Sequence, residues 1–291
     1  MEEIKLDYKV MGQGSSIVVF ESGLGGNYHD WHLVTDAIES EATLITYNRA
    51  GYGDSISPYS SRTTGQIAEE LNSILEEIGV KKEIILVGHS FGGLCVQHFA
   101  RLYPDKVKGV ILIDSTSENF NKLYTLSLPI LFSHIAIEKL VDNWNNLSKK
   151  SIDELYDLMN PVLSDEQQKL TKEVREEIEK FSTNPLTYRT MADETKNWRL
   201  SSEQIKAAND FPNIPLYVIA RDREVSIKFY TDRGIPEEEA MAYEDMWRKL
   251  QVEHSRLSEK GKFIIAAGSD HNIQLEKPKV VIDCIRELIQ L

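Results

Sequence analysis

The segment at residues 82–103 constrains the fold more than any other part of this chain. Residues 83–87 form an apolar and β-branched run, which is typical of a strand buried on both faces. Apolar residues with helical spacing follow, and Pro104 ends that helix. Between strand and helix stands Gly-His-Ser-Phe-Gly at residues 88–92, a sharp turn that points the Ser90 hydroxyl away from the sheet. We therefore interpret Ser90 as a nucleophile rather than a structural turn serine.

Length and charge limit the class of protein. A chain of 291 residues fits one large α/β domain with an insertion better than three small domains. The net charge of −13 argues against nucleic acid and anionic membrane surfaces as partners. The first ten residues lack a signal-peptide pattern, and no apolar run reaches ~18 residues, so we expect a cytoplasmic protein without stable membrane insertion. Cys95 and Cys284 are interpreted as buried thiols, with a disulfide between them as the less favoured alternative.

The order of strands and helices predicts an α/β fold. Residues 4–10 and 17–20 are interpreted as opening antiparallel strands. Further strands alternate with helices along the chain, which predicts a mostly parallel sheet with helices on both faces. The predicted strands are 43–47, 83–87, 107–113, 215–220 and 262–266, and the predicted helices are 64–78, 94–102, 237–257 and 278–291. The alternation stops between residues 115 and 212, so we predict a core of residues 1–114 and 213–291 with a helical lid at 115–212.

Four candidate reactive residues come directly after predicted strands. They are Ser90, Asp114, Asp222 and His271. Because ligands bind at the carboxyl ends of parallel strands, we expect these residues to converge on one edge of the sheet. The glycine-rich loop at residues 21–26 leaves backbone N–H groups free, and we predict an oxyanion hole from the N–H groups of Leu24 and Phe91.

His29 and His32 are the candidates for a metal site. Their spacing allows two ligands on one side of a helix, but no third ligand lies nearby in the sequence. We therefore interpret both histidines as surface or packing residues and predict no metal.

Four segments together resemble the signature segments of the α/β-hydrolase superfamily. They are residues 22–25, 48–53, 88–92 and 268–271, and the resemblance weakens only in the predicted lid. It implies an α/β-hydrolase fold, an esterase-like activity without a cofactor, and a triad in the order Ser, acid, His. The chain departs from the family where Ser22 replaces a frequent histidine, and at Asn48 and Ala50 in a turn that is often Asp-Arg-Pro-Gly.

The resemblance leaves three candidates for the triad acid. Asp222 comes early for the frequent Gly-x-x-Asp turn, and Glu224 fits it only if Arg221 takes the glycine position. Other members of the family carry the acid directly after the strand that follows the nucleophile helix, where this chain has Asp114. We favour Asp114 over Asp222 and Glu224, and a helix-capping carboxylate is its alternative role.

The function predicted from these residues is hydrolysis of a carboxylic ester or related acyl bond through Ser90, His271 and Asp114. The apolar segment at residues 123–137 suggests a small-molecule substrate with an apolar portion. The alternatives are a small-molecule receptor that uses the same pocket with little or no catalysis, and a C–C or amide hydrolase. We make no prediction of oligomeric state.

Overall fold

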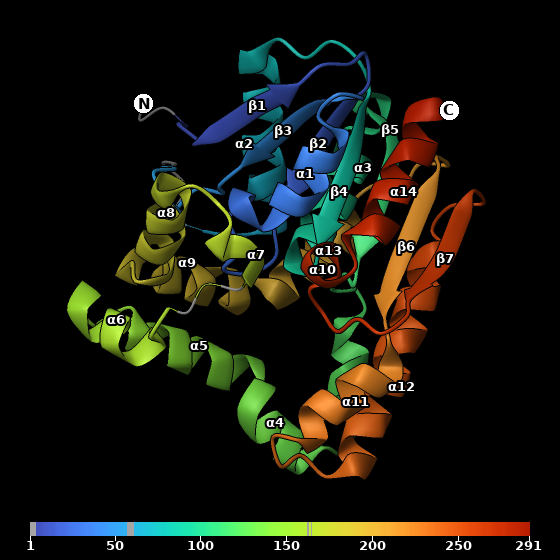
Figure 1. Ribbon diagram of the computed structural model, residues 1–291. Helices are drawn as coiled ribbons and strands as arrows, with labels where there is room; N and C mark the ends of the chain where they lie inside the picture. Colours follow the sequence, from blue (N-terminus) through green and yellow to red (C-terminus); the bar gives the residue numbers. More distant parts are fainter. Residues whose placement is uncertain (1–3, 57–60, 162, 164) are drawn as a thin grey trace.

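A single seven-stranded sheet runs through the part of the protein that the computed structural model describes, residues 4–56, 61–161, 163 and 165–291 (Figure 1). The strand order is β1-β3-β2-β4-β5-β6-β7. The strands are β1 (Tyr8–Gly12), β2 (Ile17–Glu21), β3 (Thr43–Tyr47), β4 (Ile84–His89), β5 (Val107–Ile113), β6 (Leu216–Arg221) and β7 (Gly261–Ala266). β1 is antiparallel to β3, and the other neighbouring pairs are parallel.

The prediction of two opening antiparallel strands is correct for β1 and wrong for β2. β2 lies between β3 and β4 and is parallel to both, so only β1 is antiparallel. The turn at Gly12, with a φ of 81°, packs against the end of the segment before β3, because a Cβ there would lie 2.3 Å from the Ala42 carbonyl oxygen. The chain therefore passes the end of β3 and enters the sheet on its other side. β1 also begins at Tyr8, while Lys5 makes an isolated bridge to Ile56.

The two faces of the sheet are covered by different helices, because alternate residues of each strand point to opposite sides. On β4, Ile84 and Leu86 pack in one apolar cluster with α2 (Thr64–Ile78) and α3 (Phe91–Leu102). Ile85 and Val87 pack in another with α1 (His32–Ile38) and α14 (Pro278–Gln290). In Figure 1 the helices α1 and α14 lie in front of the sheet and α2 behind it. The central strands are buried on both faces, as their apolar runs predicted.

Between β5 and β6 the chain forms a series of helices. They are η3 (Phe120–Thr125), α4 (Pro129–Ile135), α5 (Ile137–Leu147), α6 (Ile152–Met159), α7 (Asp165–Gln168), α8 (Lys172–Ser182), α9 (Pro185–Lys196) and α10 (Trp198–Ala207). Pro129 opens α4 at the first helical position, where a missing N–H costs nothing. An apolar cluster joins η3 and α4 to α11 (Arg223–Thr231) and α12 (Glu237–Ser255) of the core. We keep the boundaries of the predicted lid, residues 115–212, as a prediction.

The remaining short helices are η1 (Tyr28–Trp31), η2 (Pro104–Lys106) and α13 (Ile273–Glu276). Among the described residues, no helix combines the length and apolar character needed to cross a membrane. Cys95 and Cys284 are both buried and are not joined in a disulfide.

Candidate active site

Ser90 sits at the tight turn that the sequence predicted between β4 and α3. Its φ of 53° is unusual for a residue other than glycine, and such strain persists only where the surroundings fix the backbone. The Ser90 N–H donates to the Ile113 carbonyl at 3.0 Å, and the Ser90 carbonyl accepts from the Thr116 N–H at 3.0 Å. The turn also needs Gly92, because a Cβ there would lie 2.3 Å from the carbonyl oxygen of Glu21. Strand β2 therefore packs directly against the start of α3.

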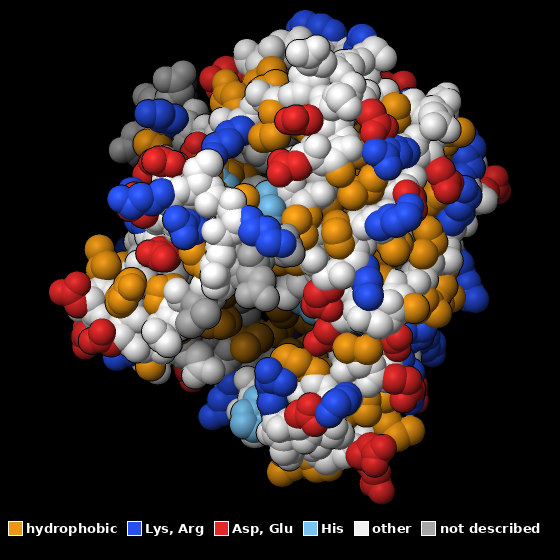
Figure 2. Space-filling model, in the orientation of Figure 1, with side chains coloured by type: hydrophobic (Ala, Val, Ile, Leu, Met, Phe, Trp, Pro, Cys, Tyr) orange, Lys and Arg blue, Asp and Glu red, His pale blue; other side chains and the backbone are white. Residues whose placement is uncertain are grey.

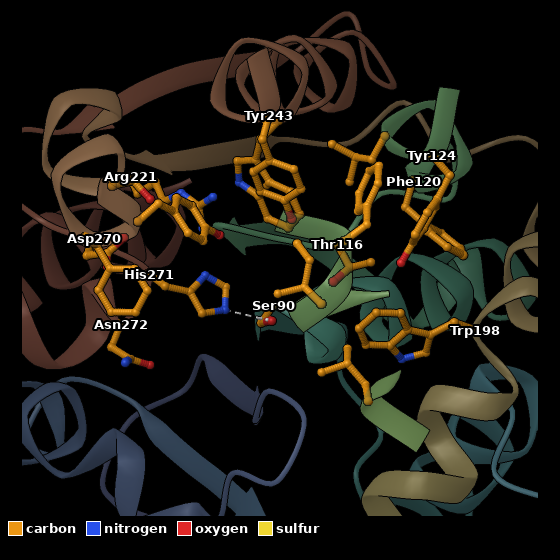
Figure 3. A pocket seen from close by; sticks show the side chains of 18 residues that line it. Ser90, Thr116, Phe120, Tyr124, Trp198, Arg221, Tyr243, Asp270, His271 and Asn272 are labelled. Atoms are coloured by element: carbon orange, nitrogen blue, oxygen red, sulfur yellow. Dashed lines mark hydrogen bonds between the residues drawn. The ribbon is translucent and has the colours of Figure 1, made fainter. Parts of the chain in front are cut away.

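His271 lies between β7 and α13 and bonds to two other candidate residues. Its Nε2 lies 2.9 Å from Ser90 Oγ, and its Nδ1 lies 2.6 Å from Asp114 Oδ2 (Figure 3). An ionised carboxylate only accepts hydrogen bonds, so the Nδ1 atom carries the hydrogen and Nε2 is left to accept from the serine hydroxyl. The three side chains thus form one continuous chain of hydrogen bonds.

Asp114 is fully buried at the end of β5 and is surrounded by donors. Arg221 NH1 lies 3.1 Å from its Oδ2, and Trp247 Nε1 donates to its Oδ1 at 2.8 Å. Burial by itself would raise the pKa of Asp114, but the Arg221 charge and the hydrogen bonds from His271 and Trp247 outweigh it. The pKa of Asp114 therefore lies well below its usual range, and the carboxylate stays ionised beside the imidazole.

The two alternative acids have other partners. Asp222 accepts from the Glu224 N–H at 3.1 Å and from the Gly268 N–H at 2.8 Å, so it begins α11 and holds the loop after β7. Glu224 pairs with Arg223 at 2.6 Å and is exposed to solvent. Within the described residues, neither carboxylate bonds to His271, whereas Asp114 does.

Leu24 lies on the loop after β2, and Phe91 directly follows Ser90 at the start of α3. Phe91 is the first residue of α3, so its N–H has no partner inside the helix. The Leu24 N–H donates to no acceptor in the described part of the chain. A Cβ on the preceding Gly23 would lie 3.3 Å from Ser90 Cβ, which places this loop directly against the serine. Neither N–H group thus has an acceptor among the described residues, and their role as an oxyanion hole stays a prediction.

A largely apolar cavity of about 350 Å³ opens beside Ser90 and His271. Figure 2 shows the surface hollowed between the α4–α6 segment and the body of the protein, with hydrophobic side chains inside the hollow. In Figure 3, Ser90 lies between His271 and Trp198, with Tyr124 and Phe120 beyond. The apolar and aromatic lining residues are Phe120, Leu123, Tyr124, Phe132, Ile135, Leu140, Trp198, Phe229, Tyr230, Tyr243 and Trp247.

Sequence reasoning did not assign a role in the site to His89, Arg221 or Trp247. Arg221 ends the buried strand β6, and a charged residue in that position needs a buried partner, which is a signal that could have pointed to a nearby acid. His89 occupies the variable position of the serine turn. Its Nε2 bonds to the His271 carbonyl oxygen at 2.9 Å, and burial, followed by the charge of His271, lowers the pKa of His89 to about 3. The His89 ring is therefore a neutral support for the His271 backbone.

The two histidines with metal-ligand spacing, His29 and His32, have other partners. His29 Nε2 lies 2.7 Å from Glu177, and His32 Nδ1 lies 2.9 Å from the His29 carbonyl oxygen. The described residues contain no group of three or more His, Cys, Asp or Glu side chains that could hold a metal ion.

Comparison with known proteins bears on the family. A family model described as the α/β hydrolase fold matches residues 16–278. The chain is similar to an AB hydrolase superfamily protein of Gibberella zeae, with 24% identity over 94% of this chain and 86% of that protein. It is also similar to the Bacillus subtilis protein YqjL, with 32% identity over 35% of this chain and 41% of that protein. A (lyso)-N-acylphosphatidylethanolamine lipase of Homo sapiens is 33% identical over 33% of this chain and 29% of that protein. The last two matches thus span less than half of either relative.

Two solved structures share the fold. A thermophilic esterase from Thermogutta terrifontis superimposes with a TM-score of 0.60 and 18% identity, over 99% of this chain and 93% of that one. An enol-lactonase from Burkholderia xenovorans gives a TM-score of 0.67 and 14% identity, over 99% and 97%. The family model covers most of the chain and the sheet has the predicted parallel arrangement. The fold class predicted from the sequence is confirmed, and the chain belongs to the α/β-hydrolase fold family.

Proposed function

We propose that this protein is a serine hydrolase that cleaves a carboxylic ester or related acyl bond through an acyl-enzyme. The observation that carries the proposal is the hydrogen-bonded series of Ser90, His271 and Asp114, at 2.9 Å and 2.6 Å, beside an apolar cavity. A nucleophile, a base and a group that orients the base are the elements of nucleophilic acyl transfer.

In the first step His271 Nε2 accepts the Ser90 proton as Oγ attacks the substrate carbonyl carbon. The Asp114 carboxylate holds the imidazole in the required tautomer and stabilises the positive charge that forms on it. Asp114 serves this role because Arg221 and Trp247 keep it ionised and oriented without contacting the reacting atoms.

The tetrahedral intermediate places a negative charge on the former carbonyl oxygen. The free N–H groups of Leu24 and Phe91 are the donors that we assign to it, each stabilising the transition state by about 3 kcal/mol. The positive end of α3 points at the same place. His271 then protonates the leaving group, and a water molecule repeats the sequence on the acyl-enzyme to release the acid.

The walls of the cavity favour a substrate with an apolar and uncharged acyl portion. Arg221 lines the cavity, but its charge is matched by Asp114 at 3.1 Å and by Glu244, to which its Nε donates at 3.2 Å. Asp270 adds a carboxylate beside His271. A negatively charged acyl group therefore meets net negative charge in this cavity. Residues of the predicted lid, among them Phe120 and Trp198, contribute much of its apolar wall.

A cytoplasmic location stays a prediction.

Turnover of p-nitrophenyl esters tests the proposal. We expect purified protein to hydrolyse short neutral esters and Ser90→Ala to lose this activity by about 10⁴-fold or more, because the nucleophile acts as a unit with its base. Thioester and amide analogues in the same assay identify the bond that is cleaved. Tight binding of apolar ligands without Ser90-dependent turnover of any of them would instead indicate a receptor.

A further inference from the structure

A buried carboxylate from the segment between β5 and β6 reaches the loop that carries Leu24. Glu194 lies on α9, and none of its surface is exposed. Its two oxygens accept from Arg49, at 2.7 Å from Nε and 3.0 Å from NH2. Arg49 itself follows β3, so this pair ties α9 to the core at a point close to the site.

Arg49 also donates hydrogen bonds to the backbone beside Leu24. Its NH1 donates to the Ser22 carbonyl at 2.5 Å, and its NH2 donates to the Gly23 carbonyl at 2.9 Å. The Gly23 carbonyl and the Leu24 N–H belong to one peptide unit, and in a trans peptide these two groups point in opposite directions. No cis peptide occurs among the described residues. Because Arg49 binds the Gly23 carbonyl, the Leu24 N–H points away from the Arg49 guanidinium.

Tyr52 links Glu194 to the other side of Leu24. We call the contacts through Arg49 the first arm and the contacts through Tyr52 the second arm. The Tyr52 hydroxyl donates to Glu194 Oε2 at 2.7 Å and accepts from the Gly25 N–H at 3.2 Å. Glu194 is thus the common partner of both arms, one on the carbonyl before the Leu24 N–H and one on the N–H after it. The loop has no regular secondary structure of its own. These contacts hold it, together with the Gly26 N–H, which also donates to the Gly23 carbonyl at 3.2 Å, and with Glu21, which accepts from Arg49 NH1 at 2.7 Å.

We propose that Glu194 is a positioning residue for the oxyanion hole, which it orients through Arg49 and Tyr52. This inference rests on the proposed hydrolase function. Glu194 does not touch the reacting atoms; it sets the direction of the Leu24 N–H, and it does so from the predicted lid. The position of α9 and the geometry of the oxyanion hole are therefore linked.

Glu194→Gln tests the inference because it changes the hydrogen bonding with little change in shape. The glutamine amide has one acceptor oxygen, so its own NH2 group must face donors at one of the two carboxylate oxygen positions. At the Oε1 position it faces Arg49 Nε, and at the Oε2 position it faces Arg49 NH2 and the Tyr52 hydroxyl. Tyr52→Phe removes only the second arm. Glu70→Gln is the matched control, because Glu70 is equally buried, pairs with Arg62 at 2.6 Å and 3.0 Å, and does not bond to the loop.

The kinetic readout is kcat and KM with a neutral ester, together with inhibition by a trifluoromethyl ketone and its non-fluorinated methyl ketone. The fluorinated ketone adds to Ser90 and places an oxyanion in the hole, whereas the methyl ketone reports binding of the carbonyl form. We expect Glu194→Gln to lower kcat about 10- to 100-fold, somewhat less than deletion of a donor. Affinity for the fluorinated ketone should fall by a similar factor. KM and methyl-ketone affinity should change less than threefold, and Tyr52→Phe should show a smaller loss of the same kind.

Amide hydrogen exchange over residues 21–26 gives a readout that needs no activity. Exchange there should be faster in Glu194→Gln than in wild type or Glu70→Gln. Equal kcat and fluorinated-ketone affinity in Glu194→Gln and Glu70→Gln, with unchanged exchange, would overturn the inference. A loss shared equally by Glu70→Gln would also overturn it, since it would reflect general destabilisation. Wild-type protein without any turnover would overturn the proposed function instead, and the exchange data would still decide whether Glu194 orients the loop.

Discussion

Asp114→Asn is the most informative single change in the site, because four donors surround this carboxylate. His271 Nδ1 and Arg221 NH1 face Oδ2, while Trp247 Nε1 and the Arg221 backbone N–H face Oδ1. An asparagine has one acceptor oxygen, so its NH2 group must oppose one of these pairs. If the NH2 group takes the Oδ1 position, it faces the N–H groups of Trp247 Nε1 and the Arg221 backbone, and neither can lose its hydrogen. If it takes the Oδ2 position, it faces only the Arg221 NH1 donor, because the His271 imidazole can move its hydrogen from Nδ1 to Nε2 and accept from the amide.

The second arrangement is therefore favoured, and it places a hydrogen on the nitrogen that must accept the Ser90 proton. The same change in a serine protease triad lowers kcat about 10⁴-fold through this tautomer. At 1.36 kcal/mol for each factor of ten, that corresponds to about 5 kcal/mol of transition-state stabilisation. We expect a loss of this size in kcat for a neutral p-nitrophenyl ester.

Asp222→Asn is the control. Asp222 caps α11, and asparagine caps helices as well as aspartate does, so kcat should stay within about threefold of wild type. Thermal unfolding of both variants shows whether each is folded at the assay temperature. Near-normal kcat in Asp114→Asn, together with a loss of orders of magnitude in Asp222→Asn, would refute the assignment of the acid.

Three further changes probe other parts of the account. Gly23→Ala should lower kcat about 10- to 100-fold while the protein stays folded, because its Cβ would lie 2.9 Å from His89 Nδ1 and must push the oxyanion loop away; unchanged kcat would contradict the placement of that loop. Burial by itself raises the pKa of Glu118, but the hydrogen bond and charge of His254 outweigh burial and lower this pKa from 4.5 to about 2. The ionised Glu118 carboxylate therefore stabilises the folded state above pH 4.5, and this stabilisation is lost as pH falls towards 2. Glu118→Gln should therefore lose about 3 kcal/mol of unfolding free energy at pH 6 and show a flatter decline of Tm between pH 5 and 3; a parallel decline would contradict this. Esters with a terminal carboxylate on the acyl chain should show kcat/KM at least about tenfold below neutral analogues, and Asp270→Asn should narrow the difference; equal values would contradict the charge argument.

Local sequence patterns predicted most of the core. The helix expected at residues 64–78 is α2 with the same bounds. Of the strands after the insertion, β6 is shifted by one residue from the expected 215–220, and β7 begins one residue before the expected 262 and ends at the expected 266. The pairing of β1 and β2 was not predictable in this way, because hydrophobic alternation shows that a strand exists but does not show which strand it pairs with.

The site was predictable where its residues follow strands. Ser90, Asp114 and His271 each come after a strand of a parallel sheet, and the structure brings their side chains together, while their catalytic roles stay predictions. The choice among three acids stayed open in the sequence because Asp222 also follows a strand. The contact of Arg49 with Glu194 joins residues that are 145 positions apart, so no local pattern could indicate it.

Covalent labelling tests the central claim most directly, namely that Ser90 is an activated nucleophile. A fluorophosphonate probe should raise the intact mass of the wild-type protein by one adduct, which peptide mapping places on Ser90. The Ser90→Ala variant should stay unlabelled, and Asp222→Asn should label at close to the wild-type rate. An unlabelled Ser90 in folded wild-type protein, or an adduct on another residue, would contradict the account.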